Sequence, residues 1–396
     1  MLTFRLPSRL PSQLNSRIKR LFTVLAFESS ADDTCVAVVT SDRRILSNVV
    51  IRQNDLVQKH GGINPAAAAH AHQANLPIAV RQALKEANLG ISNIDGIAFT
   101  RGPGMGVCLA ATLNAAKTLA AVHDKPLVGV HHMQAHTLTA LLTTPTHNFT
   151  GEPNPAYPRF PYLTLLVSGG HTQIVLANSI NSFRIMATTL DESIGRCIDK
   201  VSRLLQIEWA GLSPGAALEK FCLEPEDGLV PDAFLPFPVI MPRKFTFSFS
   251  GLHSYVDILL ERSGGIEKLT RANRLAVARA FQQAAVEQLE EKLALALREC
   301  ERQDIKVGHL VVSGGVASNM FLRERLKACL STHATWPIQA VFPPIQFCTD
   351  NAAMVGWASM HRFLAGDHDD YTVNPRAKWS IEDLETEPQP ATSGIS

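Results

Sequence analysis

The sequence predicts an internally duplicated α/β protein, with two lobes and a ligand cleft between them. Two strand–loop–strand units, near residues 23 and 162, have tips made of small polar residues or glycine. Two strand–glycine loop–helix units also recur, one in each half of the chain. Short apolar strands alternating with helical segments are typical of α/β folds, and 396 residues suffice for two lobes.

Each lobe is expected to begin with a β-hairpin. The tip of the first is the polar loop Glu28-Ser-Ser-Ala-Asp-Asp33, and the tip of the second is Ser168-Gly-Gly-His171. Small polar residues between two apolar runs predict such tips, and an ordinary tight turn explains the glycines as well as a ligand does. The strands are expected over residues 23–27, 34–39, 162–167 and 172–177.

The glycine loops that follow are Arg101-Gly-Pro-Gly104 and Ser313-Gly-Gly315. Helices are expected after them, around 107–122 and from about 318 to 330. Such loops can hold a phosphate, because glycines let backbone N–H groups approach an anion and a helix N-terminus carries partial positive charge.

Three further segments complete the expected organisation. Apolar residues at helical spacing predict a long helix over 271–303, whose apolar face needs no role beyond the core. Phe alternating with Ser and Thr over 245–252 predicts a half-buried strand. The chain after Trp379 is expected to be mobile. The predicted parts are a first lobe over 22–143, a Pro-rich linker over 144–161, a second lobe over 162–365 and a C-terminal segment with an acidic tail over 366–396.

The formal net charge of +1 reflects two unlike ends. Residues 1–21 contain five basic residues and no acid, which is typical of a mitochondrial transit peptide, with a disordered basic tail as the alternative. The last sixteen residues contain four acids and no Lys or Arg. Between them basic and acidic residues balance, which excludes a bulk-basic nucleic-acid binder. No apolar run approaches the roughly 20 residues that cross a bilayer, so no membrane partner is expected.

The seven cysteines are an odd number, widely spaced and without a Cys-x-x-Cys pair. This pattern argues against a disulfide framework and against a zinc ribbon, and it favours a reducing compartment. Most of the thiols are expected to be small buried hydrophobic groups.

The clearest chemical signal is His131-His-Met-Gln-Ala-His136, directly after the apolar segment 126–130. His132 and His136 are four residues apart, so on a helix they share one face and can bind one metal ion, although fourteen histidines also allow a chance spacing. Asp350, before a helical run, is the best third ligand; a helix N-cap is its other explanation, and both roles can coexist. Met133 stands where a His-Glu-x-x-His protease has its general base.

Other polar residues have weaker signals. His171 can act as a base, although a histidine beside a turn is commonly structural. Asn319, at the start of a helix, can hydrogen-bond a base or ribose. Asp199 and Lys200 lie in a helical run over 194–205, where an isolated acid–base pair is commonly a surface feature.

Nine motifs occur together in one order, and over about residues 22–380 they resemble the tRNA N6-adenosine threonylcarbamoyltransferase family, in particular its mitochondrial branch. The motifs are Glu28-Ser-Ser-Ala-Asp-Asp-Thr34, His60-Gly-Gly62, Arg101-Gly-Pro-Gly104, His132…His136, Ser168-Gly-Gly-His-Thr172, Asp199-Lys200, Phe247-Ser-Phe-Ser-Gly-Leu252, Ser313-Gly-Gly-Val-Ala-Ser-Asn319 and Cys348-Thr-Asp-Asn351.

The resemblance implies the actin-like, sugar-kinase-like fold, which acetate kinase and heat-shock chaperones share and whose two lobes flank a nucleotide cleft. It implies metal-assisted transfer of a threonylcarbamoyl group from threonylcarbamoyl-AMP, supplied by a separate synthase, to N6 of adenosine 37 in mitochondrial tRNAs that read codons beginning with adenine. It further implies the mitochondrial matrix and a homodimer. An actin-like ATPase or kinase, a metalloprotease and a non-catalytic tRNA-binding scaffold are the alternatives.

The resemblance also implies roles for residues at matching positions. One divalent metal ion per subunit would be bound by His132, His136 and Asp350, and two imidazoles with one carboxylate suit Zn or Fe better than Mg. The general base would be Asp32 or His171. The acyl-adenylate would be bound by Leu166, Val167, Ser168, Gly169 and Gly170, and its nucleoside by Asp199, Gly215, Glu219 and Asn319, with Ser318 and Thr349 adjacent.

The chain departs from the family pattern at a few positions. Ala66 and His70 replace the usual Glu and Arg, which weakens a role for that segment in binding tRNA or the threonyl carboxylate. The loop before Gly215 is lengthened, and Ala31 replaces a Cys common in bacterial members. Because the body is neutral, tRNA must meet a local basic strip. Candidates, each equally explained as a solvated face, are Arg243–Lys244, Arg323–Lys327 and Arg376–Lys378.

Overall fold

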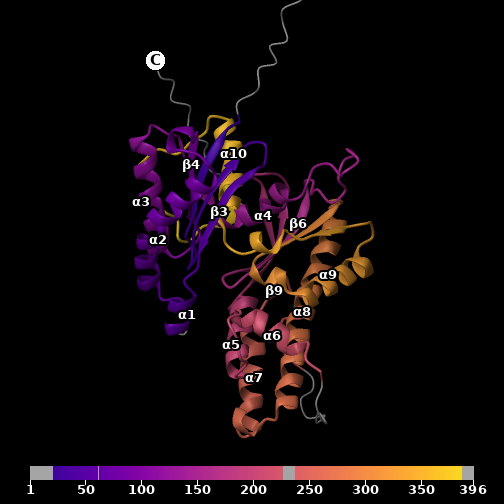
Figure 1. Ribbon diagram of the computed structural model, residues 1–396. Helices are drawn as coiled ribbons and strands as arrows, with labels where there is room; N and C mark the ends of the chain where they lie inside the picture. The colour runs from indigo at the N-terminus through magenta and orange to yellow at the C-terminus, as the bar shows by residue number, and fades with distance from the viewer. Residues whose placement is uncertain (1–20, 61, 226–236, 386–396) are drawn as a thin grey trace, which may run out of the picture.

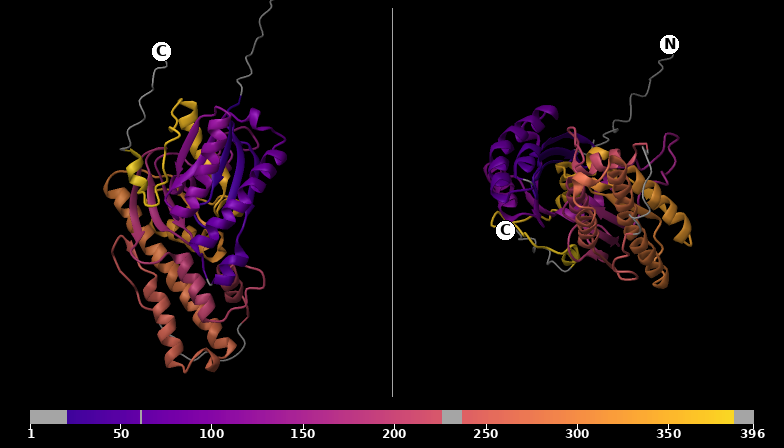
Figure 2. Two further views of the ribbon diagram at one scale, coloured as in Figure 1. Left: turned by 90° about the vertical axis from the view of Figure 1, so that its left-hand side faces the viewer. Right: turned by 90° about the horizontal axis from the view of Figure 1, so that it is seen from below.

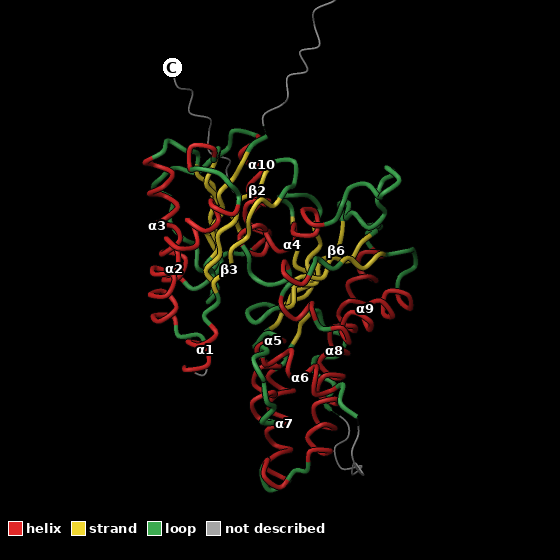
Figure 3. Tube along the Cα trace, viewed as in Figure 1, coloured by secondary structure: helices red, strands yellow, loops and turns green. Residues whose placement is uncertain are grey.

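The computed structural model describes residues 21–60, 62–225 and 237–385, which form two α/β lobes side by side (Figure 1). The strands gather in two sheets with helices around them (Figure 3). The predicted leader lies outside the described residues except for Leu21, and so does the chain after residue 385. None of the helices in the described ranges is long and apolar enough to span a membrane.

The two sheets repeat one strand order, which confirms the predicted duplication. In the first, the hairpin β1–β2 is antiparallel, and β1, β4 and β5 run parallel. In the second, β6–β7 is the antiparallel hairpin, and β6, β10 and β11 run parallel. The first sheet is β3 (Ile45–Ile51), β2 (Thr34–Thr40), β1 (Thr23–Glu28), β4 (Gly96–Gly102) and β5 (Leu127–His131), in that order. The second is β11 (Gln339–Val341), β10 (His309–Ser313), β6 (Tyr162–Val167), β7 (Thr172–Ala177), β8 (Phe183–Thr189) and β9 (Thr246–Phe247).

The helices cover both lobes, and two of them, α4 and α10, lie at the junction between the sheets. α2 and α3 pack on the outer face of the first sheet, whereas α4 contacts both sheets. Helices α7 and α8 extend away from the sheets (Figure 2). The α-helices are α1 (Asn54–His60), α2 (Pro65–Glu86), α3 (Gly106–Val122), α4 (His132–Thr143), α5 (Ile194–Leu204), α6 (Pro214–Cys222), α7 (Ser250–Arg262), α8 (Arg271–Arg302), α9 (Met320–His333) and α10 (Ala352–Leu364). Short 3₁₀ helices include η4 (Gly315–Ser318), η5 (Ile345–Phe347) and η6 (Ile381–Glu385).

Helix α10 differs from the predicted division of the chain. It falls in the range 162–365, predicted as second lobe, but it packs on β1, β2 and β4 of the first sheet and on α4. Figure 1 shows it beside the first sheet. Its buried face, with Met354 and Val355, joins an apolar core that contains strand residues from both sheets. The chain therefore returns to the first lobe at about residue 352.

The strand predicted over 245–252 is wrong beyond its first residues. Only Thr246–Phe247 pair with β8, and α7 begins at Ser250. The reason is Asp191, whose carboxylate accepts hydrogen bonds from the Ser248 hydroxyl at 2.6 Å and from the Phe249 N–H at 3.0 Å. These bonds satisfy donors at the helix start, so the chain turns into a helix where the alternation of Phe and Ser favours a strand.

The loop Arg101–Gly104 does not form the predicted phosphate cradle, because the C-terminal segment fills it. The Arg376 N–H donates to the Arg101 carbonyl at 2.7 Å, and the Gly104 N–H donates to the Ala377 carbonyl at 3.2 Å. At Gly102 a β-carbon would lie 1.8 Å from the Arg376 carbonyl oxygen. The part of the chain after Trp379 that the structure describes is likewise packed and not mobile, since Ile381 is 2% exposed.

All seven cysteines are buried and free, as predicted. Burial raises the pKa of the Cys108 and Cys300 thiols to about 11. These thiols are therefore protonated near neutral pH and act as packing groups.

Candidate active site

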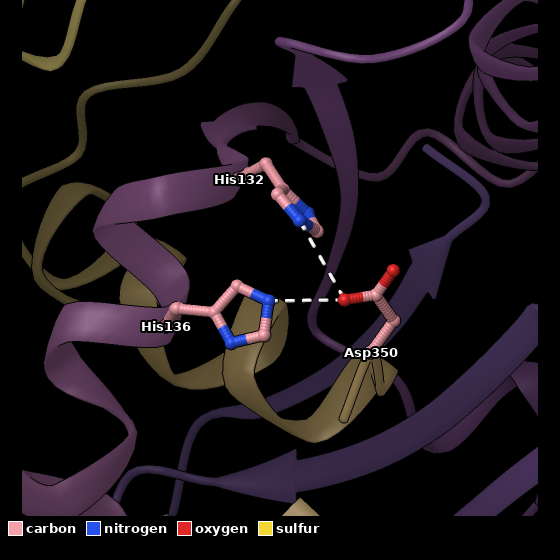
Figure 4. A group of neighbouring side chains, drawn as sticks. All are labelled: His132, His136 and Asp350. Atoms are coloured by element: carbon pink, nitrogen blue, oxygen red, sulfur yellow. Dashed lines mark hydrogen bonds and ion pairs between the residues drawn. The ribbon is translucent and has the colours of Figure 1, made fainter. Parts of the chain in front are cut away.

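Helix α4 and the loop before α10 bring two histidines and one aspartate together. His132 is the first residue of α4 and His136 follows one turn later, so both rings leave the same face of the helix (Figure 4). The Asp350 Oδ1 atom lies 3.0 Å from His136 Nε2 and 3.6 Å from His132 Nε2. One ligand atom from each residue lies within 4.8 Å of the others. Two imidazole nitrogens and one carboxylate are a donor set suited to a transition metal.

Asp350 is not the N-cap of α10. That position belongs to Asn351, whose side-chain oxygen accepts a hydrogen bond from the Met354 N–H at 3.0 Å. The cap explanation for Asp350 is therefore wrong. Because Asn351 satisfies the helix end, the Asp350 carboxylate is left to face the histidines.

Glu28 supports His132 from the other side, a role that sequence reasoning missed. Its carboxylate is fully buried at the end of β1, and Oε2 lies 3.2 Å from His132 Nδ1. Glu28 also accepts hydrogen bonds from the Ser30 N–H and the Thr100 hydroxyl. A carboxylate behind a ligating histidine orients the ring and raises its basicity. The sequence contains one signal for this role: Glu28 is an acid directly after the apolar run of β1, where a buried carboxylate needs a partner.

The charges around His132 compensate its burial. Burial alone lowers the pKa of this imidazole, but Glu28 and Asp350 outweigh it and raise the pKa to about 9. Conversely, burial opposes ionisation of Asp350, but His132 and His136 hold the pKa of that carboxyl well below its usual range. A proton and a metal cation therefore compete for the same nitrogen atoms.

The second hairpin tip, Ser168–His171, lies next to this cluster. The His171 ring centroid is 6.1 Å from that of His132. Gly169 and Gly170 are exposed, and a β-carbon on either would find nothing within 4 Å. The Gly170 N–H donates to Ser168 Oγ at 3.2 Å, so it has a partner within the turn. Ser193 Oγ donates to the Gly169 carbonyl at 2.6 Å and thereby anchors the turn to the start of α5.

Leu166 and Val167 cannot line a ligand with their side chains, contrary to the simplest form of the prediction. Leu166 is 1% exposed and Val167 is fully buried, and they belong to two different cores. Both residues are buried backbone included, so in this structure they support the turn that follows and do not reach a ligand. The same packing explains Gly314, whose φ is +101° and where a β-carbon would lie 2.2 Å from the Val167 carbonyl oxygen.

A largely apolar hollow lies in the second lobe, and two predicted nucleoside-binding residues, Gly215 and Asn319, are on its wall. Asn319 caps α9 by accepting from the Leu322 N–H at 2.8 Å, and its amide nitrogen lies 3.5 Å from Gln282 Oε1. The hollow has a volume of only about 20 Å³, room for roughly one water molecule, so a planar base does not fit inside it and would meet only its rim. The other lining residues include Ile198, Leu218, Phe281 and Val316.

Three more predicted residues border this region. Glu219 accepts a hydrogen bond from the Met320 N–H at 2.6 Å, so this carboxylate supports the start of α9. The Ser318 hydroxyl donates to the Gly315 carbonyl at 2.7 Å, and so it has an internal partner. A β-carbon on Gly315 would lie 3.6 Å from the Thr349 methyl group, which places Thr349 beside η4.

Comparison with known proteins decides the family. The sequence profile of the tRNA N6-adenosine threonylcarbamoyltransferases matches residues 44–357. The chain belongs to this family. A tRNA N6-adenosine threonylcarbamoyltransferase of Bartonella tribocorum is 36% identical over 372 residues, which cover 91% of this chain and 95% of the relative. A mitochondrial one of Schizosaccharomyces pombe is 37% identical over 382 residues, 93% of this chain and 88% of the relative. The predicted family and enzyme class, an acyltransferase, are confirmed.

The fold is also found among solved structures. The crystal structure of T. kodakarensis HypF superposes with a TM-score of 0.52 at 14% identity, over 87% of this chain and 48% of that chain. At this identity the likeness concerns the fold alone. With the duplicated sheets it confirms the predicted actin-like, sugar-kinase-like architecture of this transferase.

Asp32 and Asp33 of the transferase lie at the first hairpin tip, where burial perturbs both carboxyls. Burial raises the pKa of Asp32, and burial together with the neighbouring Asp32 and Asp350 raises the pKa of Asp33 to about 7. Arg52 is 3.9 Å from Asp33. Asp199 of α5 has a pKa raised to about 6 by burial, against Arg203, and Asp32 adds to this effect. The tip of the first lobe and α5 of the second therefore share one electrostatic environment.

His171 differs from these acids. Burial, with His132 and His136 adding to it, lowers the pKa of its ring to about 4. The imidazole is therefore neutral near pH 7 and has a lone pair available. A neutral imidazole beside the cluster meets the first requirement of a general base.

Proposed function

We propose that this transferase moves the threonylcarbamoyl group from threonylcarbamoyl-AMP to N6 of adenosine 37 in mitochondrial tRNAs that read codons beginning with adenine. The observation that carries the proposal is the cluster of His132, His136 and Asp350 beside the exposed glycine turn, in a chain of this family. The donor would come from a separate synthase. The basic residues 1–21 and the similarity to mitochondrial relatives support a site of action in the mitochondrial matrix.

The metal proposal rests on the donor atoms themselves. His132, His136 and Asp350 would hold one divalent ion, with Zn or Fe favoured over Mg because two of the three ligands are imidazoles. Glu28 would orient His132, and Ser313, whose hydroxyl lies 3.4 Å from His136 Nδ1, would orient His136. When bound, such an ion supplies a Lewis acid that can polarise the acyl oxygen or neutralise the leaving phosphate.

The chain's own residues would bind and orient the donor. The exposed backbone at Gly169 would approach the acyl-phosphate without a side chain in the way, while the buried Leu166 and Val167 would hold the strand end behind this turn. Gly215 and Asn319 would contact the nucleoside at the rim of the apolar hollow. Asp199 follows the lining residue Ile198, and the Glu219 carboxylate lies at the start of α9. Because the mixed anhydride is already activated, correct placement supplies much of the rate.

In the transfer step the N6 nitrogen of adenosine bonds to the carbamoyl carbon, the bond from that carbon to the phosphate oxygen breaks, and AMP leaves. The N6 proton passes to a base, since the lone pair of this amine is delocalised into the ring. His171 and Asp32 are the two proposed acceptors. His171 is supported by its lowered pKa, which leaves the ring neutral, and Asp32 by a raised pKa that makes it a stronger base.

The proposed partners are a tRNA and a second copy of this chain. The tRNA would meet a local basic strip, for which Arg243–Lys244, Arg323–Lys327 and Arg376–Lys378 are the candidates. Arg323 and Lys327 lie 4.7 Å and 5.9 Å from the centre of the Phe342 ring, so they share one aromatic support. A homodimer is proposed as the working form.

A reconstituted reaction tests the proposal. The protein is incubated with threonine, bicarbonate, ATP, a threonylcarbamoyl-AMP synthase and anticodon-bearing tRNA, and the nucleosides are analysed by mass spectrometry. Threonylcarbamoyladenosine that depends on both proteins is expected. ATP hydrolysis without modified adenosine would instead support the kinase-like alternative. Cleavage of a peptide would support the metalloprotease alternative. Mass spectrometry of mitochondrial tRNA after loss of the protein tests the compartment.

A further inference from the structure

A C-terminal strap, residues 374–385, crosses from the first lobe to the second beside the active site. At the first lobe, Arg101 Nε donates to the Asn374 carbonyl at 3.1 Å, in addition to the backbone bonds of Arg376 and Ala377 given above. At the second lobe, the Ile185 N–H of β8 donates to Glu382 Oε1 at 2.8 Å, and Ser182 Oγ donates to Glu385 Oε2 at 2.9 Å. The strap is therefore fixed at both ends, to different lobes.

Trp379 is the buried centre of this strap. Its ring is 8% exposed and is covered by two guanidinium groups, with Arg376 Cζ at 4.5 Å and Arg101 Cζ at 5.5 Å from the ring centre. On another side it meets the imidazole of His131, with ring centres 4.6 Å apart. Cation–π contacts of this kind hold an aromatic ring in place more firmly when they are desolvated.

His131 connects the strap to the helix that carries the histidine cluster. Its Nε2 atom is 3.2 Å from the Trp379 carbonyl oxygen, and its Nδ1 atom is 3.1 Å from the Met133 nitrogen and 3.4 Å from the Gln134 nitrogen. A carbonyl only accepts, so the hydrogen-bond network assigns the proton to Nε2 and the lone pair to Nδ1. His131 thus serves as the N-cap of α4, using an imidazole where Ser, Thr, Asp or Asn is usual.

We propose that Trp379 and His131 are positioning residues for the metal-ligand helix. The Trp379 carbonyl fixes the tautomer of His131 and the Trp379 ring fixes its plane. The His131 ring in turn caps α4 by accepting from the N–H groups of Met133 and Gln134. This inference rests on the proposed metal role of His132 and His136. It assigns to the C-terminal strap a task in the reaction, namely to set the direction from which His132 presents Nε2.

The test separates the cap from its connection to the strap. His131→Asn keeps an oxygen near the position of Nδ1 and so keeps the cap, but it no longer depends on Trp379. Trp379→Ala removes the ring that supports His131. Trp336→Ala is the matched control. This tryptophan is half-buried in the second lobe, and its Nε1 donates to the Val307 carbonyl at 2.6 Å, so its loss tests general loosening.

The measured quantities are the affinity of the full chain for Co²⁺, followed by the d–d absorption of the bound ion, and the hydrogen-exchange rates of the Met133 and Gln134 amides. Trp379→Ala is expected to weaken Co²⁺ binding about tenfold, the low end of losses seen when a group behind a ligand is removed. It should also speed exchange of both amides. His131→Asn should stay within about threefold of the unsubstituted chain. In the double variant, Trp379→Ala should lower the Co²⁺ affinity of His131→Asn by less than about twofold, because the contact between His131 and Trp379 is already lost.

Two results would overturn the inference. One is that Trp379→Ala lowers the Co²⁺ affinity equally in the unsubstituted chain and in His131→Asn. That result would exclude His131 as the connection between Trp379 and the metal ligands. The other is an equal loss in Trp336→Ala, which would mean that any destabilised variant binds weakly. Failure of the unsubstituted chain to bind Co²⁺ would sink the metal proposal instead. In that case the amide exchange rates alone decide whether Trp379 supports the cap of α4.

Discussion

The glycine loops after β4 and β10 occupy equivalent places in the two lobes but have different surroundings. In the first lobe, Arg101–Gly104 is covered by the C-terminal strap, and a β-carbon at Gly102 would lie 1.8 Å from the Arg376 carbonyl. In the second, the loop that begins at Ser313 borders Thr349 and leads through η4 to the apolar hollow. The same local pattern is therefore covered by a distant segment in one lobe and left uncovered by it in the other.

The hairpin tips differ in the same way. The first tip carries the buried Glu28 and two acids with raised pKa values, and it supports His132. The second tip carries two exposed glycines with open space around them. Of these two equivalent tips, the first therefore provides charged groups and the second leaves open space around its glycines.

The largest expected effect comes from filling that room. Gly169→Val should lower transfer about a hundredfold, because a displacement of the order of 1 Å at the reacting centre can cost that much. Thermal unfolding should change little, since a β-carbon there meets nothing within 4 Å. Gly308→Val, at a similarly open glycine in the same lobe, is the control and should leave transfer unchanged. Normal transfer by Gly169→Val would show that the tip does not face the substrate.

Gly102→Ala should have the opposite profile. The β-carbon would meet the Arg376 carbonyl from a backbone with φ +152°, so a loss of about 3 kcal/mol in the free energy of unfolding is expected. Urea denaturation measures it. Gly170→Ala should change the same quantity by less than about 0.5 kcal/mol. Equal losses from the two substitutions would remove the contrast between covered and open loops.

A smaller effect is expected at Asp191, which holds the chain between the second tip and α7. Burial raises the pKa of this carboxyl, but hydrogen bonds from Ser248 and Ser250 outweigh it and lower the pKa to about 2, from 3.8. The folded-state pKa is depressed, so the stabilisation is present above about pH 4 and is lost as the pH falls toward 2. Asp191→Asn should flatten the acid limb of a plot of unfolding free energy against pH. An unchanged limb would contradict the assignment.

The smallest effect concerns tRNA. The chain between residues 22 and 380 is neutral, so few phosphate contacts are expected and the affinity should fall only modestly with salt, by about 0.9 log unit per contact for each tenfold change. Binding titrations at several salt concentrations give this slope. A steep slope would mean that a large basic surface exists on the molecule.

Much of the fold and part of the site followed from local pattern. Apolar runs with polar tips predicted the hairpins β1–β2 and β6–β7, and the four-residue spacing predicted that His132 and His136 share a helix face. What failed depends on distant contacts. The strand predicted over 245–252 is overridden by Asp191, which lies more than fifty residues earlier in the chain.

The same limit applies to the site. Nothing local indicates that the strap fills Arg101–Gly104, that α10 crosses to the first lobe, or that Glu28 lies behind His132. Asp350 and Asn351 are both suitable caps by sequence. Only the folded chain shows that Asn351 caps α10 and that Asp350 faces the histidines.

Mass spectrometry of tRNA nucleosides after the reconstituted reaction tests the central claim most directly, with three proteins side by side. The unsubstituted chain should form threonylcarbamoyladenosine. His132→Ala should form at least about a hundredfold less product. Its circular dichroism spectrum should match that of the unsubstituted chain, and its unfolding should remain cooperative. His147→Ala, at an exposed histidine outside the cluster, should react normally. Near-normal product from a folded His132→Ala would contradict the proposed role of the His132–His136–Asp350 cluster.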